Sequence, residues 1–328
     1  MISALLNPAL LTFIFGIVIG NIFKNRHPSP LLSKYFGYYL LFGLGLKGGL
    51  SLQKTGLTND VVTVLTLGIF FAFLVPIISY FYLKNILNSD DAAALAGTYG
   101  SVSAVTFVTA NTYLVTSSQI YDNYMTAVLV VMEFPAIFMA LYLVTKSSSV
   151  SSSNNLKTIK TAFLETPNVI LIVSLLLGYL VNFENVRFFQ IVTVTIFDWV
   201  LIAFLFVMGL RVSKRIHELS GKSYKLITFA LVTPILGALL ALFFSFYFGL
   251  NIGNTTLLMV LTASASYIAV PAVVKDAIPN ANPAIYLGLS LGVTFPFNVI
   301  IGIPVYNQLA ILLLLSLIHI SEPTRQSP

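Results

Sequence analysis

Apolar residues recur in long runs along this chain, and short polar stretches separate the runs. A bilayer core of about 30 Å needs roughly 20 consecutive apolar residues to cross it as a helix. The pattern therefore predicts an all-α polytopic membrane protein with ten transmembrane helices, over residues 5–23, 35–50, 61–82, 92–114, 124–145, 167–183, 195–212, 226–249, 255–274 and 284–306.

One stretch between the runs has low complexity. It reads SSSVSSSNN, residues 147–155, and its Ser/Asn-rich composition predicts a flexible linker. The linker separates residues 1–146, with five predicted spans, from residues 156–314, with five more. We expect each half to be one structural repeat.

The two halves share a pattern of motifs. Four motifs of the first half return in the second half in the same order, about 160 residues later, as the pairs Pro8 and Pro167, Gly45 and Gly209, Ser101 and Ser264, and Phe134 and Phe295. This order indicates an internal duplication. Because each copy has an odd number of spans, the second copy must enter the membrane upside down. The resulting 5+5 inverted repeat is typical of secondary transporters.

Composition supports a membrane protein. Of the 328 residues 57% are hydrophobic and 9% are charged, and the mean hydropathy is +0.93. One soluble core could not bury so many apolar residues. The chain has no cysteine, which excludes disulfides, thiolate metal sites and cysteine nucleophiles.

The distribution of positive charge predicts an orientation. With the N-terminus outside, thirteen of the 17 Lys and Arg residues fall in cytoplasmic loops and three in outer loops. The positive-inside rule then places both termini outside, and the basic balance needs no nucleic-acid partner. Lys47 and Arg211 hold matching repeat positions, and we interpret them as interfacial anchors rather than substrate contacts. The cluster Arg211, Lys214 and Arg215 is expected mainly to set orientation, with binding of anionic lipid or of a regulatory partner as the alternative extra role.

Hydroxyl-bearing residues gather inside the fourth and ninth predicted spans, at Ser101, Ser103 and Thr106 and at Ser264 and Ser266, which Pro271 follows. A helix broken in lipid survives only where protein or water supplies hydrogen-bond partners. Inverted-repeat transporters place two broken helices at the midplane and bind anions at their N-termini. A single such motif would indicate close helix packing. The symmetrical placement instead predicts broken helices in spans 4 and 9 and a substrate site for a compact anion.

Glu133 lies near the middle of the fifth predicted span, beside Phe134 and Pro135. An ionised carboxylate at that depth is costly unless it faces a cavity or a cation, which favours a functional role. It could be a sodium ligand, together with Thr106 and Ser266, a proton carrier or the partner of a lysine. A protonated, purely structural glutamate is the alternative.

Enzyme motifs are missing from the sequence. It has no HExxH, no GxSxG, no Walker A and no Rossmann glycine pattern. We therefore expect no enzyme, and transport that runs on ion gradients. A sodium-driven anion symporter is the leading hypothesis. A cation/proton antiporter that uses Glu133 and a gated anion channel are the alternatives.

Three motifs carry a family resemblance: GTYGSVSAVTFVTA at residues 97–110, VMEFPA at 131–136 and ASASYIAVPAVVKDAIPNANPAIYLG at 263–288. They resemble the sodium-dependent bicarbonate transporters of cyanobacteria, the SbtA family. The resemblance implies a ten-span inverted-repeat fold in a bacterial plasma (inner) membrane, sodium/bicarbonate symport, a homotrimer and, in some members, a PII-like regulator. It places the anion pocket on Ser101, Ser103, Thr106, Ser264 and Ser266.

Several positions depart from the pattern that this resemblance leads us to expect. Ser103-Ala104-Val105-Thr106 stands where the family pattern reads S-G-S-T, so one hydroxyl is lost. Tyr267 stands where the family pattern has an acidic residue, a candidate sodium ligand, and Glu133 stands where it has an aspartate. The coupling ion is still expected to be Na+.

The end of the chain is unusual. LSLIHISEPTR, residues 315–325, resembles the translation of a sequencing adapter. We therefore expect residues 315–328 to be a non-native tail, with a genuine polar tail as the alternative.

Overall fold

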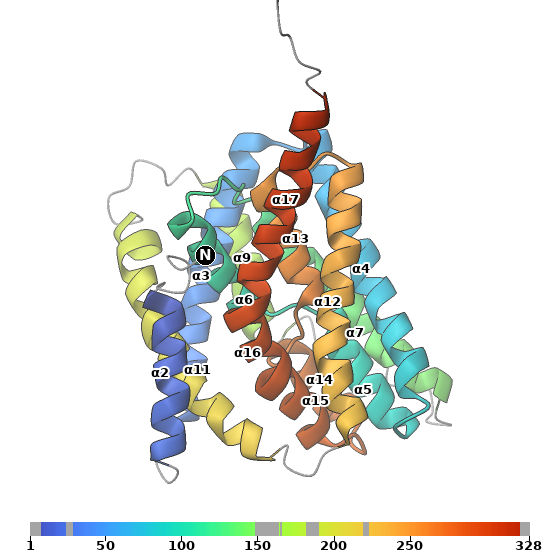
Figure 1. The fold of residues 1–328 in the computed structure, drawn as a ribbon. Coiled ribbons are helices and arrows are strands. Elements are labelled where there is room, and N and C mark those ends of the chain that lie inside the picture. The colour runs from blue at the N-terminus through green and yellow to red at the C-terminus, as the bar shows by residue number, and fades with distance from the viewer. Residues whose placement is uncertain are drawn as a thin grey trace, which may run out of the picture.

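The computed structural model describes residues 8–23, 29–147, 164, 166–181, 190–218 and 223–321, and in these residues it contains helices and no strand. Figure 1 shows a bundle of long helices. The first half holds α2 (Pro8–Ile22), α3 (Pro30–Thr55), α4 (Asn59–Leu83), α5 (Ser89–Gly100), α6 (Ala104–Thr116) and α7 (Met125–Ser147). The second half holds α9 (Thr166–Leu180), the π-helical η2 (Ile191–Ile196), α11 (Phe197–Glu218), α12 (Tyr224–Tyr247), α13 (Ile252–Ala263), α14 (Ala269–Ala277), α15 (Pro283–Leu289), η3 (Ser290–Thr294), α16 (Phe295–Phe297), η4 (Asn298–Gly302) and α17 (Ile303–Ser321).

Several of these helical segments are long and apolar enough to cross a bilayer. In the described residues they are Asn59–Leu83, Ser89–Thr116, Ile191–Arg215, Tyr224–Tyr247 and Pro283–Leu314. Three further apolar helices, in α2, α9 and α13, are shorter. Large apolar side chains such as Leu236 and Phe243 of α12 are exposed on the outside, as a lipid-facing surface requires. The protein is a helical membrane protein, and the count of ten spans stays a prediction.

The two halves pack against each other through α2 and α3 of the first half and α9 and α11 of the second half. The most extensive helix contacts among the described residues join α3 to α9 and α2 to α11, so each pair takes one helix from each half. Small residues bring the backbones together, because a Cβ at Gly49 of α3 would overlap the Leu175 carbonyl oxygen and one at Gly209 of α11 would overlap the Phe13 carbonyl oxygen. Such close approach is a common way to pack helices in membranes.

We expect Gly49→Ala to destabilise the protein by about 1–3 kcal/mol, because the added methyl group forces α3 and α9 apart. Gly37→Ala on the same helix is the control, since its Cβ would lie 3.7 Å from the Phe204 ring, an ordinary contact. Thermal unfolding in detergent measures both. Equal melting temperatures for the two variants would show that the α3–α9 contact does not depend on a glycine.

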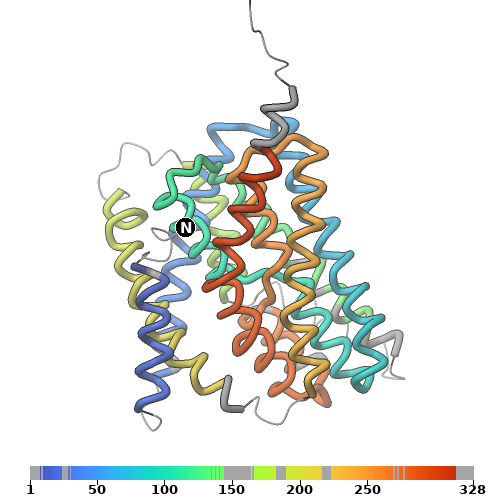
Figure 2. The backbone as a smooth tube through the Cα atoms, viewed as in Figure 1, coloured from blue at the N-terminus to red at the C-terminus, as the bar shows by residue number. Residues whose placement is uncertain are grey.

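The fourth and ninth predicted spans are both interrupted, as expected. Residues 101–103 separate α5 from α6, and residues 264–268 separate α13 from α14. Figure 2 shows both interruptions between the two ends of the bundle rather than at either end. Pro271 does not itself make the second break. It is the third residue of α14, in the first turn, where a missing N–H costs no hydrogen bond.

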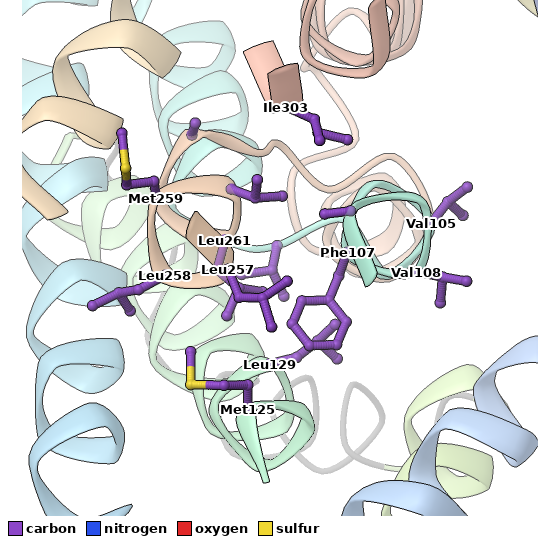
Figure 3. Packing of buried hydrophobic residues seen from close by; sticks show 14 of the residues in the cluster. Val105, Phe107, Val108, Met125, Leu129, Leu257, Leu258, Met259, Leu261 and Ile303 are labelled. Carbon is purple, nitrogen blue, oxygen red and sulfur yellow. The ribbon is translucent and has the colours of Figure 1, made fainter. Parts of the chain in front are cut away.

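Buried apolar side chains pack the two interrupted helices together. Figure 3 shows Val105 and Phe107 of α6, Leu129 of α7 and Leu257 and Leu261 of α13 in one cluster. All five side chains are at most 5% exposed. Apolar packing of α6, α7 and α13 therefore helps to fix the position of both breaks.

The last predicted span ends later than expected. The sequence analysis ended it at Tyr306, whereas α17 runs to Ser321 because the apolar run after Tyr306 continues the helix. The first residues of the predicted tail, 315–321, thus belong to α17, and residues 322–328 lie outside the described residues. All of the predicted linker except Ser147 also lies outside them.

Candidate anion and sodium site

Two hydrogen bonds join the interruptions of the two halves. The Ser103 N–H donates to Ser264 Oγ at 2.9 Å, and the Ser266 N–H donates to the Thr98 carbonyl oxygen at 2.9 Å. Ser264 Oγ in turn donates to the Leu261 carbonyl oxygen at 2.8 Å. The polar groups that each break leaves free are therefore partly satisfied by the other break, which is the condition for broken helices in a membrane.

The first residues of α6 and α14 lie at these breaks. Ser103 caps α6, because its Oγ accepts hydrogen bonds from Thr106 N at 3.2 Å and from Thr106 Oγ1 at 2.8 Å. Ser266 Oγ accepts from Val270 N in the first turn of α14, at 3.4 Å. Helix N-termini carry unpaired N–H groups and partial positive charge. The two half-helices thus bring two positive dipole ends into the same region.

Glu133 of α7 supports the first break. Its Oε2 accepts a hydrogen bond from Ser101 Oγ at 3.0 Å, and its carboxylate also accepts from the Val102 N–H. The side chain is 7% exposed. No lysine or arginine of the described residues pairs with it. A buried carboxylate without a positive partner is the kind of group that a bound cation would stabilise.

Asn298 of η4 supports the second break, and the sequence analysis missed it. Its Nδ2 donates to the Ala263 carbonyl oxygen at 2.8 Å, and its Oδ1 accepts from Tyr306 Oη at 3.0 Å. The available signal was an amide inside an apolar run, since such residues are rare in membrane spans unless they have a partner. Each interrupted span is therefore contacted at its break by a polar side chain from the next predicted span.

A small cavity of about 40 Å³ lies at the junction of the breaks. Its polar lining comprises Ser103, Glu133, Asn168, Ser266 and Tyr267, and apolar side chains such as Leu41 and Leu129 form the rest. The Tyr267 hydroxyl is buried beside Ser103, yet makes no hydrogen bond of normal geometry within the described residues. It is thus a donor that a ligand in the cavity could use.

The structure brings all the predicted site residues to the breaks but gives them different positions. Ser103, Ser266 and Glu133 line the cavity. Ser101, Thr106 and Ser264 are buried and do not line it. Ser101 donates a hydrogen bond to Glu133, Thr106 donates to Ser103 at the α6 cap, and Ser264 accepts from the Ser103 N–H of the opposite break. Asn168 and Tyr267 join the lining, and the sequence analysis did not assign either to the site.

The oxygen atoms that could ligate a metal ion at this site suit a hard cation rather than a transition metal. Among the described residues no group of three His, Cys, Asp or Glu side chains lies close enough to hold a metal ion. Carboxylate, hydroxyl and carbonyl oxygens are what hard cations prefer. Of the three predicted sodium ligands, Glu133 and Ser266 face the cavity and Thr106 does not.

A helical membrane protein in which two interrupted helices meet at a small cavity with polar side chains in its lining has the arrangement of a secondary transporter. Residues 8–311 match the family model of the Na+-dependent bicarbonate transporter superfamily, and the chain belongs to that superfamily. This is a family of transporters and not of enzymes, and its transport depends on sodium. A search of curated proteins found no match to the chain.

Proposed function

We propose that this protein is a secondary active transporter that couples Na+ to the uptake of bicarbonate at the cavity between the two breaks. The observation that carries the proposal is that Ser103, Ser266 and Glu133 share one buried cavity at the N-termini of α6 and α14. One part of this site suits an anion and the other suits a cation. Family membership supplies the identity of the two ions.

The anion is bound by donors from both halves. Ser103, Ser266 and Tyr267 supply hydroxyls, and the first turns of α6 and α14 supply N–H groups and positive dipole ends. The cavity exceeds the roughly 10–15 Å³ that one water molecule needs, so it admits a species of a few heavy atoms. Bicarbonate, with three oxygens that accept hydrogen bonds, fits this set of donors.

The cation is bound by Glu133. Sodium would neutralise the buried carboxylate, and Ser266 lies in the same cavity to complete the oxygen ligands. Each ion then lowers the electrostatic cost of the other, because a lone charge in a low-dielectric site is unfavourable. This mutual stabilisation is the physical basis that we propose for coupling, and it is reciprocal by thermodynamic linkage.

We also propose that the halves form a 5+5 inverted repeat with ten spans. Two similar helix contacts support this. In one, Gly16 and Gly20 of α2 lie against Gly209 and Ser213 of α11. In the other, Ser174 and Gly178 of α9 lie against Gly45, Leu46 and Gly49 of α3. Relative motion of the repeats would expose the cavity alternately to the two sides. A homotrimer, a PII-like regulator and a bacterial inner-membrane location stay predictions from the family resemblance.

Binding measurements test the proposal without transport. In detergent, bicarbonate should raise the melting temperature of the purified protein strongly when Na+ is present and weakly when choline replaces it, because a ligand stabilises the state it binds. A sodium effect that needs no anion and releases a proton would favour the cation/proton antiporter. Equal shifts by bicarbonate with and without sodium would contradict coupling.

A further inference from the structure

A second, larger cavity adjoins the small one. Its volume is about 610 Å³, and it lies between α3, α6 and α11. The two cavities share five lining residues, namely Leu41, Ala104, Pro167, Tyr267 and Ile268. Tyr267 therefore stands at the boundary between the larger cavity and the candidate ion site.

The charge in the larger cavity has one sign. Lys34 of α3 and Arg211, Lys214 and Arg215 of α11 line it, and among the described residues its lining includes no aspartate or glutamate. Lys34 and Lys214 are exposed, whereas Arg211 and Arg215 are partly buried. The cavity thus opens to the surface through exposed lysines and becomes less exposed toward its arginines.

The basic residues on α11 lie close together, and their like charges repel each other. Positions 214 and 215 come three and four residues after Arg211, so both side chains are neighbours of Arg211 on the helix, and like charges at these spacings destabilise a helix. Arg211 lies close enough to Arg215 for their charges to repel, and Tyr267 lines the same cavity. The positive-inside rule requires positive charge on this side of the membrane, but it does not require it inside a cavity.

We propose that this larger cavity is an anion vestibule, in which Arg211 holds a small oxyanion next to Tyr267 on its way between the surface and the site at Ser103 and Ser266. The inference rests on the proposed function and assigns a role to Arg211 that an interfacial anchor would not have. The vestibule lies at the end of the bundle where α2 and α11 finish and α3 begins, the lower end in Figure 1. This is the side that the charge distribution predicts to be cytoplasmic.

A cavity lined by one sign of charge concentrates ions of the opposite sign and raises their rate of entry by roughly 10- to 1,000-fold. The oxyanion could be a free ion such as bicarbonate, or it could belong to the headgroup of an acidic lipid. Both would contact the same arginines. The test therefore needs separate arms for the free anion and for the lipid.

The absence of native cysteine allows a direct test. Leu287→Cys introduces one thiol into the vestibule lining, on α15 rather than on the helices that carry the charged residues. In phosphatidylcholine vesicles, a negatively charged methanethiosulfonate reagent should label this thiol at least about tenfold faster than a positively charged one of similar size. Arg211→Gln combined with Lys214→Gln should remove the preference, and Lys84→Gln, which removes a positive charge outside the vestibule, should keep it.

Two competitors identify the source of the oxyanion. Bicarbonate should slow the labelling of the Leu287→Cys thiol, with or without sodium, if the free anion occupies the vestibule. If phosphatidylglycerol slowed the labelling and bicarbonate did not, the proposal would be overturned in favour of a lipid site. Equal labelling by both reagents would overturn it outright.

This test is independent of transport. If sodium-dependent uptake were absent while charge-selective labelling and bicarbonate protection remained, the proposed function would fail and the vestibule would stand. Where uptake is present, Arg211→Gln should raise the KM for bicarbonate about tenfold and, at saturating bicarbonate, leave the KM for sodium unchanged. An equal change in both would assign Arg211 a structural role instead.

Discussion

Glu133→Gln is expected to abolish sodium-dependent bicarbonate uptake while the protein remains folded. The glutamine keeps nearly the same size and can still accept hydrogen bonds from Ser101 Oγ and the Val102 N–H, but it offers no charge to a cation. We expect uptake to fall at least about tenfold, which corresponds to ~1.4 kcal/mol. The thermal stability in sodium-free buffer should not decrease, because the substitution removes a buried charge that has no partner.

Two further variants separate a sodium ligand from a structural glutamate. Glu133→Asp keeps the carboxylate and should retain part of the sodium dependence. Asp60→Asn removes an exposed carboxylate at the start of α4 and should leave uptake unchanged. Initial uptake rates as a function of sodium concentration measure all three variants. Normal sodium dependence in folded Glu133→Gln protein would contradict the role that we assign to Glu133.

Loss of the hydroxyl at Ser103 or Ser266 is expected to weaken bicarbonate binding. A hydrogen bond to a charged group contributes about 1.5–3 kcal/mol, so each Ser→Ala variant should raise the KM for bicarbonate by roughly ten- to a hundredfold. Ser264→Ala should act differently, since Ser264 lies outside the cavity lining and bonds the opposite break. It should lower thermal stability more than it changes the KM.

A control for helix capping is needed, because Ser103 also caps α6. Thr58→Ala removes the capping hydroxyl of α4, which accepts a hydrogen bond from Val61 N at 3.5 Å. It should cost at most about 0.5–2 kcal/mol of stability and should not change the KM. If Thr58→Ala raised the KM as much as Ser103→Ala does, the effect at Ser103 would come from the cap and not from the substrate.

The positions of several long apolar helices were predictable because the length of an apolar run is set by the bilayer. The predicted span over residues 61–82 corresponds to α4, Asn59–Leu83, and the one over 226–249 to α12, Tyr224–Tyr247. The interruptions were also predictable, because the hydroxyls of two equivalent Ser-x-Ser motifs need partners that lipid cannot supply. The single predicted span over residues 284–306 is a series of α- and π-helical turns, which the apolar pattern alone does not reveal.

The roles of the site residues were less predictable. Ser103 and Ser264 belong to equivalent motif types, yet one lines the cavity and the other bonds the first one's N–H. That difference depends on how the two breaks meet, which is a contact between residues 161 apart in the chain. Asn298 was missed for the same reason, since its partner Ala263 lies on another helix. Arg211 faces a cavity that no local pattern encodes.

The most direct test of the account is the uptake of radiolabelled bicarbonate into proteoliposomes of the purified protein, with an inward sodium gradient and with sodium equal on both sides. We predict accumulation above the external concentration only with the gradient, and loss of that accumulation in Glu133→Gln. Bicarbonate entry that merely equilibrates, at the same rate with and without the gradient, would indicate a channel and would contradict sodium-coupled symport.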